Sequence, residues 1–151
     1  MAEKIQPDNV VELRARALRL LARREHTRQE LEGKLSPHAG SSEDLQGLIS
    51  GLKQKNQLSE ERFAEERARS LSRKYGAARI RQDLRAKGVS DELIGRVTSE
   101  GELERARAIL ERKYRSPAAS REERAKRMRF LQGRGFSFDI IRSLLSSRDA
   151  E

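Results

Sequence analysis

The spacing of apolar residues constrains this chain more than any other feature, because intervals of three and four recur along the sequence. Leu45, Leu48, Ile49 and Leu52 follow the i, i+3, i+4, i+7 pattern that places side chains on one face of an α-helix. No stretch alternates apolar and polar residues as a half-buried strand does. The sequence therefore predicts an all-α fold. The predicted helices span residues 10–24, 27–35, 42–55, 59–74, 76–87, 90–99, 101–114, 120–133 and 137–147.

Capping residues separate these helices. Thr27 with Glu30, and Ser120 with Glu123, have the spacing of a capping box, in which a hydroxyl accepts from a backbone N–H and the acid reaches back to the cap. Two glycines are expected to end helices in the left-handed conformation, and these are Gly88 and Gly135.

An internal repeat groups the helices in threes. Residues 88–94 resemble residues 135–141, and an Arg-Ala-Arg triplet recurs at 14–16, 67–69 and 105–107. Units of this size bury little surface alone and gain stability by packing on their neighbours. The predicted organisation is an N-terminal tail at 1–9, three-helix repeats at 10–57, 58–100 and 101–147, and a C-terminal tail at 148–151.

The charge balance indicates a polyanionic partner. The chain has 33 Lys and Arg against 24 Asp and Glu, a formal net charge of +9. Such an excess attracts phosphate, although a solvated surface explains any single arginine. Basic clusters include Arg73-Lys74 and Arg112-Lys113 with Arg115. An apolar run long enough for a membrane span and a signal peptide are both missing, so we expect a cytoplasmic protein with no membrane partner.

Catalytic chemistry has little support. The chain has no cysteine, no glycine-rich phosphate loop and only two histidines. His26 beside the Thr27 cap and His38 in a loop are interpreted as exposed residues without a metal or base role. Paired acids such as Glu60 and Glu61 lie at helix starts, where the helix dipole accounts for them. We expect no enzymatic activity, no cofactor and no metal.

The six aromatic residues are better placed for cores than for stacking on nucleic-acid bases. Tyr75 and Tyr114 each follow an Arg-Lys pair at a helix end, so these two are expected to be partly exposed. Without a distinct recognition helix, sequence-specific base reading is disfavoured.

Four stretches in order, spread over residues 12–146, resemble the RecX family. They are Leu20–Leu31, Leu58–Ala64, Tyr75–Ser90 and Arg129–Phe136. Within them, Ala77 replaces a usual Pro, Asp83 a usual Glu and Gly133 a common Arg.

The resemblance implies three tandem three-helix repeats in an elongated, curved monomer. It also implies a regulator that binds the RecA–DNA filament and inhibits RecA ATP hydrolysis, filament growth and strand exchange in recombinational repair. The alternative is a basic helical module that binds single- or double-stranded DNA directly. The residues expected to contact the partner or DNA are the basic ones in the matched stretches, namely Arg23, Arg24, Arg28, Arg79, Arg81, Lys87, Arg129 and Arg134.

Overall fold

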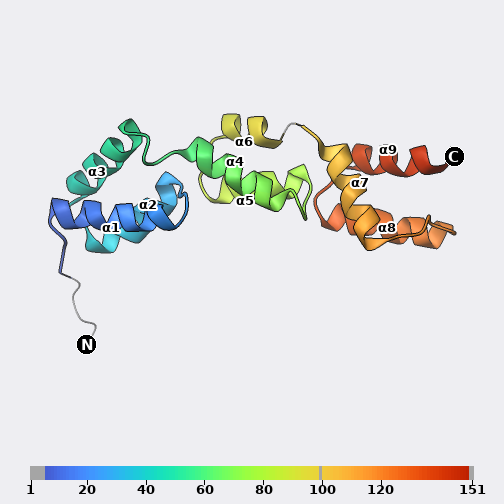
Figure 1. Ribbon diagram of the computed structural model, residues 1–151, viewed down its shortest axis with the longest axis horizontal. Helices are drawn as coiled ribbons and strands as arrows, with labels where there is room; N and C mark the ends of the chain where they lie inside the picture. The colour runs from blue at the N-terminus through green and yellow to red at the C-terminus, as the bar shows by residue number, and fades with distance from the viewer. Residues whose placement is uncertain (1–5, 99, 150–151) are drawn as a thin grey trace. The chain divides into compact units, whose positions relative to one another are not determined.

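The computed structural model describes residues 6–98 and 100–149, and that part of the chain is helical with no strand (Figure 1). Each predicted helix is confirmed, with ends within three residues of the prediction; Ser99, predicted to end the sixth, lies outside the described residues. The helices are α1 (Val10–Arg23), α2 (Arg28–Leu35), α3 (Ser42–Gln54), α4 (Glu60–Leu71), α5 (Ala77–Ala86), α6 (Asp91–Thr98), α7 (Glu102–Lys113), α8 (Arg121–Gly133) and α9 (Phe138–Asp149), with a short 3-10 turn, η1 (Ser36–His38), after α2.

The capping predictions are confirmed at α2 and half confirmed at α8. Thr27 Oγ1 accepts from the Glu30 N–H at 3.1 Å, and the Glu30 carboxylate accepts from the Thr27 N–H. Ser120 accepts from the Glu123 N–H, but the Glu123 carboxylate accepts from the Ala119 N–H at 2.7 Å. The acid therefore reaches one residue beyond the cap, and it still pairs a backbone donor before the helix begins.

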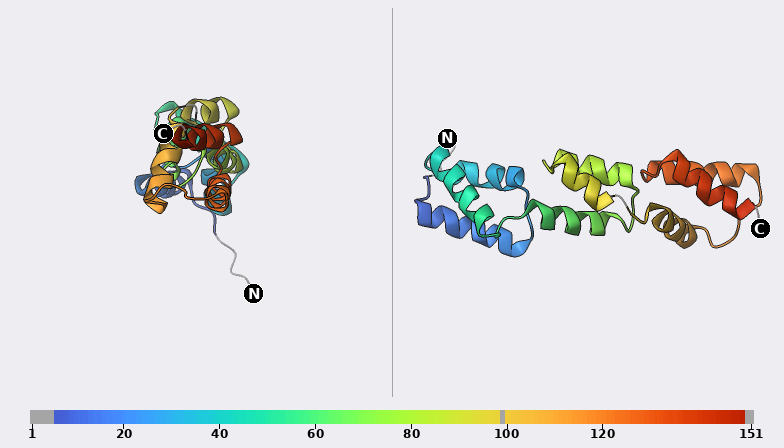
Figure 2. Two further views of the ribbon diagram at one scale, coloured as in Figure 1. Left: turned by 90° about the vertical axis from the view of Figure 1, so that its right-hand side faces the viewer. Right: turned by 90° about the horizontal axis from the view of Figure 1, so that it is seen from above.

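The first three and the last three helices pack in groups of three. Helices α1, α2 and α3 enclose one apolar core, which includes Leu13, Leu31 and Ile49 and also buries Leu58. Helices α7, α8 and α9 enclose another around Leu110 and lie side by side in both views of the C-terminal part (Figures 1 and 2). Between these groups along the chain, α5 packs on α6.

Two compact units result. The first runs to Phe63 and includes Lys87–Val89; the second comprises Ala64–Ala86 and the chain from Ser90 onward. The buried core residues of the first unit come chiefly from α1–α3, and those of the second come chiefly from α5–α9.

Inside the second unit, the backbone at the start of α5 bonds directly to the backbone of the turn between α8 and α9. The N–H groups of Gly76 and Ala78, which begin α5, donate to the carbonyls of Arg134 and Gly135 in the turn between α8 and α9. These bonds satisfy helix donors that have no intrahelical acceptor. A Cβ on Gly76 would lie 2.5 Å from the Gly135 carbonyl oxygen, so only glycine fits there. We call this contact the Gly76–Gly135 joint.

Both glycines predicted to be left-handed are confirmed. Gly135 has φ +92° and Gly88 has φ +88°. Gly88 lies against Gln29 at the start of α2, inside the first unit. Gly88 thus lies near the start of α2, and Gly135 lies near the start of α5.

None of the described helices is both long and apolar enough to cross a lipid bilayer.

Candidate functional site

The predicted basic residues of the first unit are largely neutralised. Arg24 forms an ion pair with Glu30 at 2.7 Å, and its guanidinium also donates to a backbone carbonyl. Arg28 pairs with Glu32 at 2.9 Å and donates to the Gln46 side chain. Arg23 is exposed in the last turn of α1. Surface ion pairs add little to stability, but they reduce the charge that these arginines offer to a polyanion.

Two of the predicted residues converge in the second unit. The guanidinium carbons of Arg79 and Arg134 lie 4.6 and 5.7 Å from the centre of the Tyr75 ring. Arg79 Nη1 also donates to the Gly133 carbonyl at 3.2 Å, so Arg79 supports the Gly76–Gly135 joint. Of the other predicted residues, Arg81 and Arg129 are exposed, and Lys87 is half-buried in the first unit.

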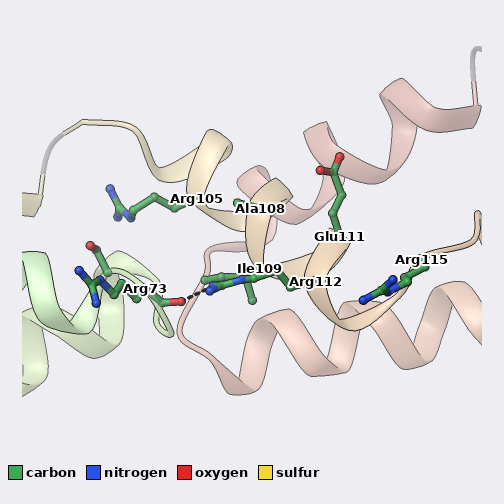
Figure 3. Close-up of a pocket in the computed structure, with 8 residues that line it drawn as sticks. Arg73, Arg105, Ala108, Ile109, Glu111, Arg112 and Arg115 are labelled. Atoms are coloured by element: carbon green, nitrogen blue, oxygen red, sulfur yellow. Dashed lines mark hydrogen bonds between the residues drawn. The ribbon is translucent and has the colours of Figure 1, made fainter.

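A basic groove lies in the second unit, along α7 and the chain that leads from α4 to α5. It consists of two hollows of about 730 and 370 Å³ that share Arg73, Ile109 and Arg112 in their walls. Figure 3 shows the first hollow with its arginines. The first hollow is lined by Ser72, Arg73, Arg105, Ala108, Ile109, Glu111, Arg112 and Arg115. The second is lined by Arg73, Lys74, Tyr75, Ile109, Arg112, Lys113, Phe130 and Arg134.

Helix ends position the groove residues. Helix α4 stops at Leu71, and the next residues carry Arg73 and Lys74 past α7. An Arg112 guanidinium nitrogen donates to the Arg73 carbonyl, which fixes this turn against α7 (Figure 3). Of the eight predicted site residues, Arg134 alone lines either hollow. Most of the residues that line the groove were not predicted as site residues. The sequence feature that could have indicated them is the Arg-Lys-Tyr triplet, which occurs at 73–75 and again at 112–114.

Cationic side chains of the protein lie over the aromatic rings beside the groove. Lys113 Nζ lies 4.3 Å from the centre of the Phe130 ring, and Arg134 lies 5.2 Å from it. Arg127 lies 4.5 Å from the Tyr114 ring centre. Tyr75 and Tyr114 are half-buried, as predicted. Cations over ring faces stabilise the structure electrostatically and occupy the surfaces on which a base would stack.

The groove charges lack acidic partners. In residues 6–98 and 100–149, Arg73, Lys74, Arg112 and Lys113 have no carboxylate within ion-pair distance. Arg105 donates from Nη1 to the Glu100 carbonyl at 2.6 Å, while its Nε and Nη2 have no acceptor among the described residues. Residues 101–147 contain twelve Lys and Arg against six Asp and Glu. Among the residues that line the two hollows, seven are Lys or Arg and one, Glu111, is acidic, so positive charge is gathered here with little local compensation.

The prediction that His26 is exposed is wrong. His26 is 1% exposed. Its Nδ1 lies 3.0 Å from the Arg24 carbonyl and its Nε2 lies 2.9 Å from Lys34 Nζ, so both ring nitrogens have partners. Apolar helical spacing gives no indication of this burial, because His26 lies between α1 and α2 and not within a helix. Within the described ranges, no three His, Asp or Glu side chains meet in a metal-binding cluster.

These features define a class of protein: a small helical protein of three-helix groups that carries a basic groove on its surface. Residues 14–38, 59–97 and 100–145 match the first, second and third three-helix domains of RecX. The chain belongs to the RecX family.

Similar proteins support the same assignment. The chain is 40% identical to the regulatory protein RecX of Ralstonia nicotianae over 95% of this chain and 92% of that protein. It is 43% identical to the regulatory protein RecX of Herbaspirillum seropedicae over 90% of both chains. Its fold resembles the crystal structure of RecX from Lactobacillus salivarius, with a TM-score of 0.82 at 23% identity over 94% of this chain and 97% of that chain.

Proposed function

We propose that this protein binds the RecA–DNA filament and inhibits RecA ATP hydrolysis, filament growth and strand exchange. The observation that carries the proposal is the match of all three RecX domains, in order, to this chain. It acts as a monomer in the cytoplasm, and by binding rather than by catalysis. Its net charge of +9 supports a fast, electrostatically steered encounter with an acidic filament.

The test is DNA-dependent ATP hydrolysis by the cognate RecA with this protein titrated in at two salt concentrations. We expect inhibition well below one protein per RecA, because a regulator of filament growth acts on many subunits at once. Inhibition should weaken at the higher salt concentration, since charge steers the encounter. Unchanged ATP hydrolysis at stoichiometric protein would rule the proposal out.

A charge reversal on α5 tests the contact surface. Arg81 is exposed and forms no hydrogen bond or ion pair within the part of the chain that the structure describes, whereas Arg79 supports the Gly76–Gly135 joint. Arg81→Glu is therefore expected to weaken inhibition several-fold without loss of helicity. The matched control is Lys53→Glu, an equal charge change at an exposed position outside the matched stretches. If both variants inhibit as well as the unmodified protein does, Arg81 does not contact the partner and is only a solvated surface residue.

A further inference from the structure

We propose that a cleft between α4 and α5 binds a segment of the RecA filament in which an apolar side chain lies next to an acidic one. The inference rests on the proposed function and adds to it the place and the chemistry of one contact. The cleft, which we call the α4–α5 cleft, has a volume of about 330 Å³ and lies inside the second unit. It is lined by Arg67, Leu71, Tyr75, Arg79, Gln82, Asp83 and Ala86.

The α4–α5 cleft differs in charge from the basic groove. Arg67 donates to the Asp83 carboxylate from Nε at 2.9 Å and from Nη2 at 3.1 Å, so this pair is neutral as a whole. One positive charge remains in the lining, on Arg79. A chain of phosphates gains its affinity from many neutralised charges, and the cleft offers it only one. A single carboxylate is enough to balance Arg79 through a charge-assisted hydrogen bond.

The walls of the cleft are held in place before any partner binds. The bidentate ion pair of Arg67 and Asp83 ties α4 to α5. The Arg79 guanidinium lies 4.6 Å from the centre of the Tyr75 ring, and its Nη1 donates to the Gly133 carbonyl. These contacts restrict the side chains that would meet a partner, so less conformational freedom is lost when it binds.

The lining of the cleft has the composition of a protein interface. Leu71 and Tyr75 are half-buried and Ala86 is exposed, so their apolar surface can be reached from solvent. Tyrosine and arginine are enriched at the centres of such interfaces, where a few residues dominate the binding energy. An aliphatic side chain of the partner can pack on Leu71 and Ala86 while a neighbouring carboxylate meets Arg79.

Two polar side chains of the cleft also favour a peptide. The Tyr75 hydroxyl and the Gln82 amide form no hydrogen bond with any other residue that the structure describes. Tyrosine hydroxyls usually find a partner when they become buried. A peptide backbone brings both donors and acceptors, whereas the phosphodiester backbone of DNA brings acceptors alone and leaves the Gln82 carbonyl without a donor.

The experiment measures binding of the full-length protein to a RecA filament assembled on single-stranded DNA, and inhibition of ATP hydrolysis separately. Ala86→Leu fills the cleft with a side chain that suits a helix. The matched control is Ala15→Leu, the same change at an exposed position of α1. Gln82→Ala removes an amide that has no bond within the described chain. Circular dichroism verifies that all three variants keep their helicity.

We expect Ala86→Leu to bind the filament about tenfold more weakly, which is the effect of losing one dominant interface contact. Gln82→Ala is expected to bind several-fold more weakly, and Ala15→Leu to bind like the unmodified protein. Binding of each variant to a bare oligonucleotide should be unchanged. The proposal is overturned if Ala86→Leu binds the filament normally, or if it loses the same affinity for the bare oligonucleotide.

Cross-linking identifies the occupant of the cleft. A photo-crosslinking side chain at position 82 is expected to attach to a RecA peptide, and mass spectrometry to place the link beside an acidic residue with an apolar neighbour. Links to DNA alone, or to a peptide without an acidic residue, would contradict the proposal.

The two readouts separate this inference from the proposed function. Filament binding without inhibition of ATP hydrolysis would count against the proposed function, and the variants would still decide on the cleft. Inhibition that Ala86→Leu leaves unchanged would count against the cleft alone. If the unmodified protein does not bind the filament, both proposals are wrong.

Discussion

At the scale of the residue, His26 is held neutral by its surroundings. Burial lowers its pKa below the ordinary value of 6.5, and the charges of Arg24 and Lys34 lower it further against a bond to the Arg24 carbonyl. With Lys34 Nζ donating to Nε2, a proton on that nitrogen would break the bond and place two cations together. In the unfolded chain His26 titrates at its ordinary pKa.

The difference between the folded and unfolded pKa values of His26 predicts that the folded protein loses stability in acid. Because the unfolded state binds the proton more tightly, the free energy of unfolding falls as pH drops below about 6.5 toward the lowered folded pKa, with a slope of at most about 1.4 kcal/mol per pH unit. His26→Gln removes the titrating group, so its melting temperature should fall less between pH 7 and 5 than that of the unmodified protein. Identical pH profiles for the variant and the unmodified protein would contradict the role of His26.

At the scale of the element, helix positions were predictable because the signals for them are local. Apolar spacing and capping residues lie within each helix, and the Thr27 capping box formed as its spacing indicated. The Gly76–Gly135 joint was not predictable, because neither glycine indicates which distant backbone it meets. The groove was missed for a similar reason: residues 73–75 and 112–115 meet only after α7 has packed. The two Arg-Lys-Tyr triplets were visible in the sequence, but nothing local ties them together.

The joint makes Gly76 irreplaceable in a way that helix glycines are not. In Gly76→Ala, the new Cβ meets the Gly135 carbonyl at 2.5 Å, so we expect a loss of about 1–3 kcal/mol in the free energy of unfolding. Gly47→Ala is the matched control: no atom lies within 4 Å of the new Cβ on α3, and alanine favours the helix by about 0.5–1 kcal/mol. Thermal unfolding followed by circular dichroism should shift in opposite directions. A shift of the same sign in both variants would show that the joint tolerates a side chain.

At the scale of the whole molecule, charge is unevenly distributed. Residues 58–100 contain ten Lys and Arg against eight Asp and Glu, whereas residues 101–147 contain twelve against six. The net charge was readable from composition, but its concentration beside the groove depends on the fold. The curvature implied by the family resemblance stays a prediction, since it depends on angles between repeats that no local pattern specifies.

Self-repulsion from this charge predicts that salt stabilises the protein. Raising the salt concentration shortens the Debye length and screens the repulsion, so the melting temperature should rise by a few degrees between about 25 and 250 mM. Arg115→Gln, which removes one exposed groove charge, should reduce the rise. A melting temperature that falls with salt would show that the ion pairs, such as Arg16 with Asp8, outweigh the repulsion.

The Gly76–Gly135 joint has a consequence for how such a protein can change over generations. The two hydrogen bonds of the joint join backbone groups, so they depend on the side chains at few positions, chiefly on the two glycines that allow the close approach. Apart from Arg79 and Arg112, whose guanidinium groups donate to backbone carbonyls in this region, the basic and aromatic residues around the joint can therefore be exchanged one by one while its peptide bonds remain. The residues that form the joint and most of those that carry the surface charge are therefore different, so the charge can change while the joint stays the same.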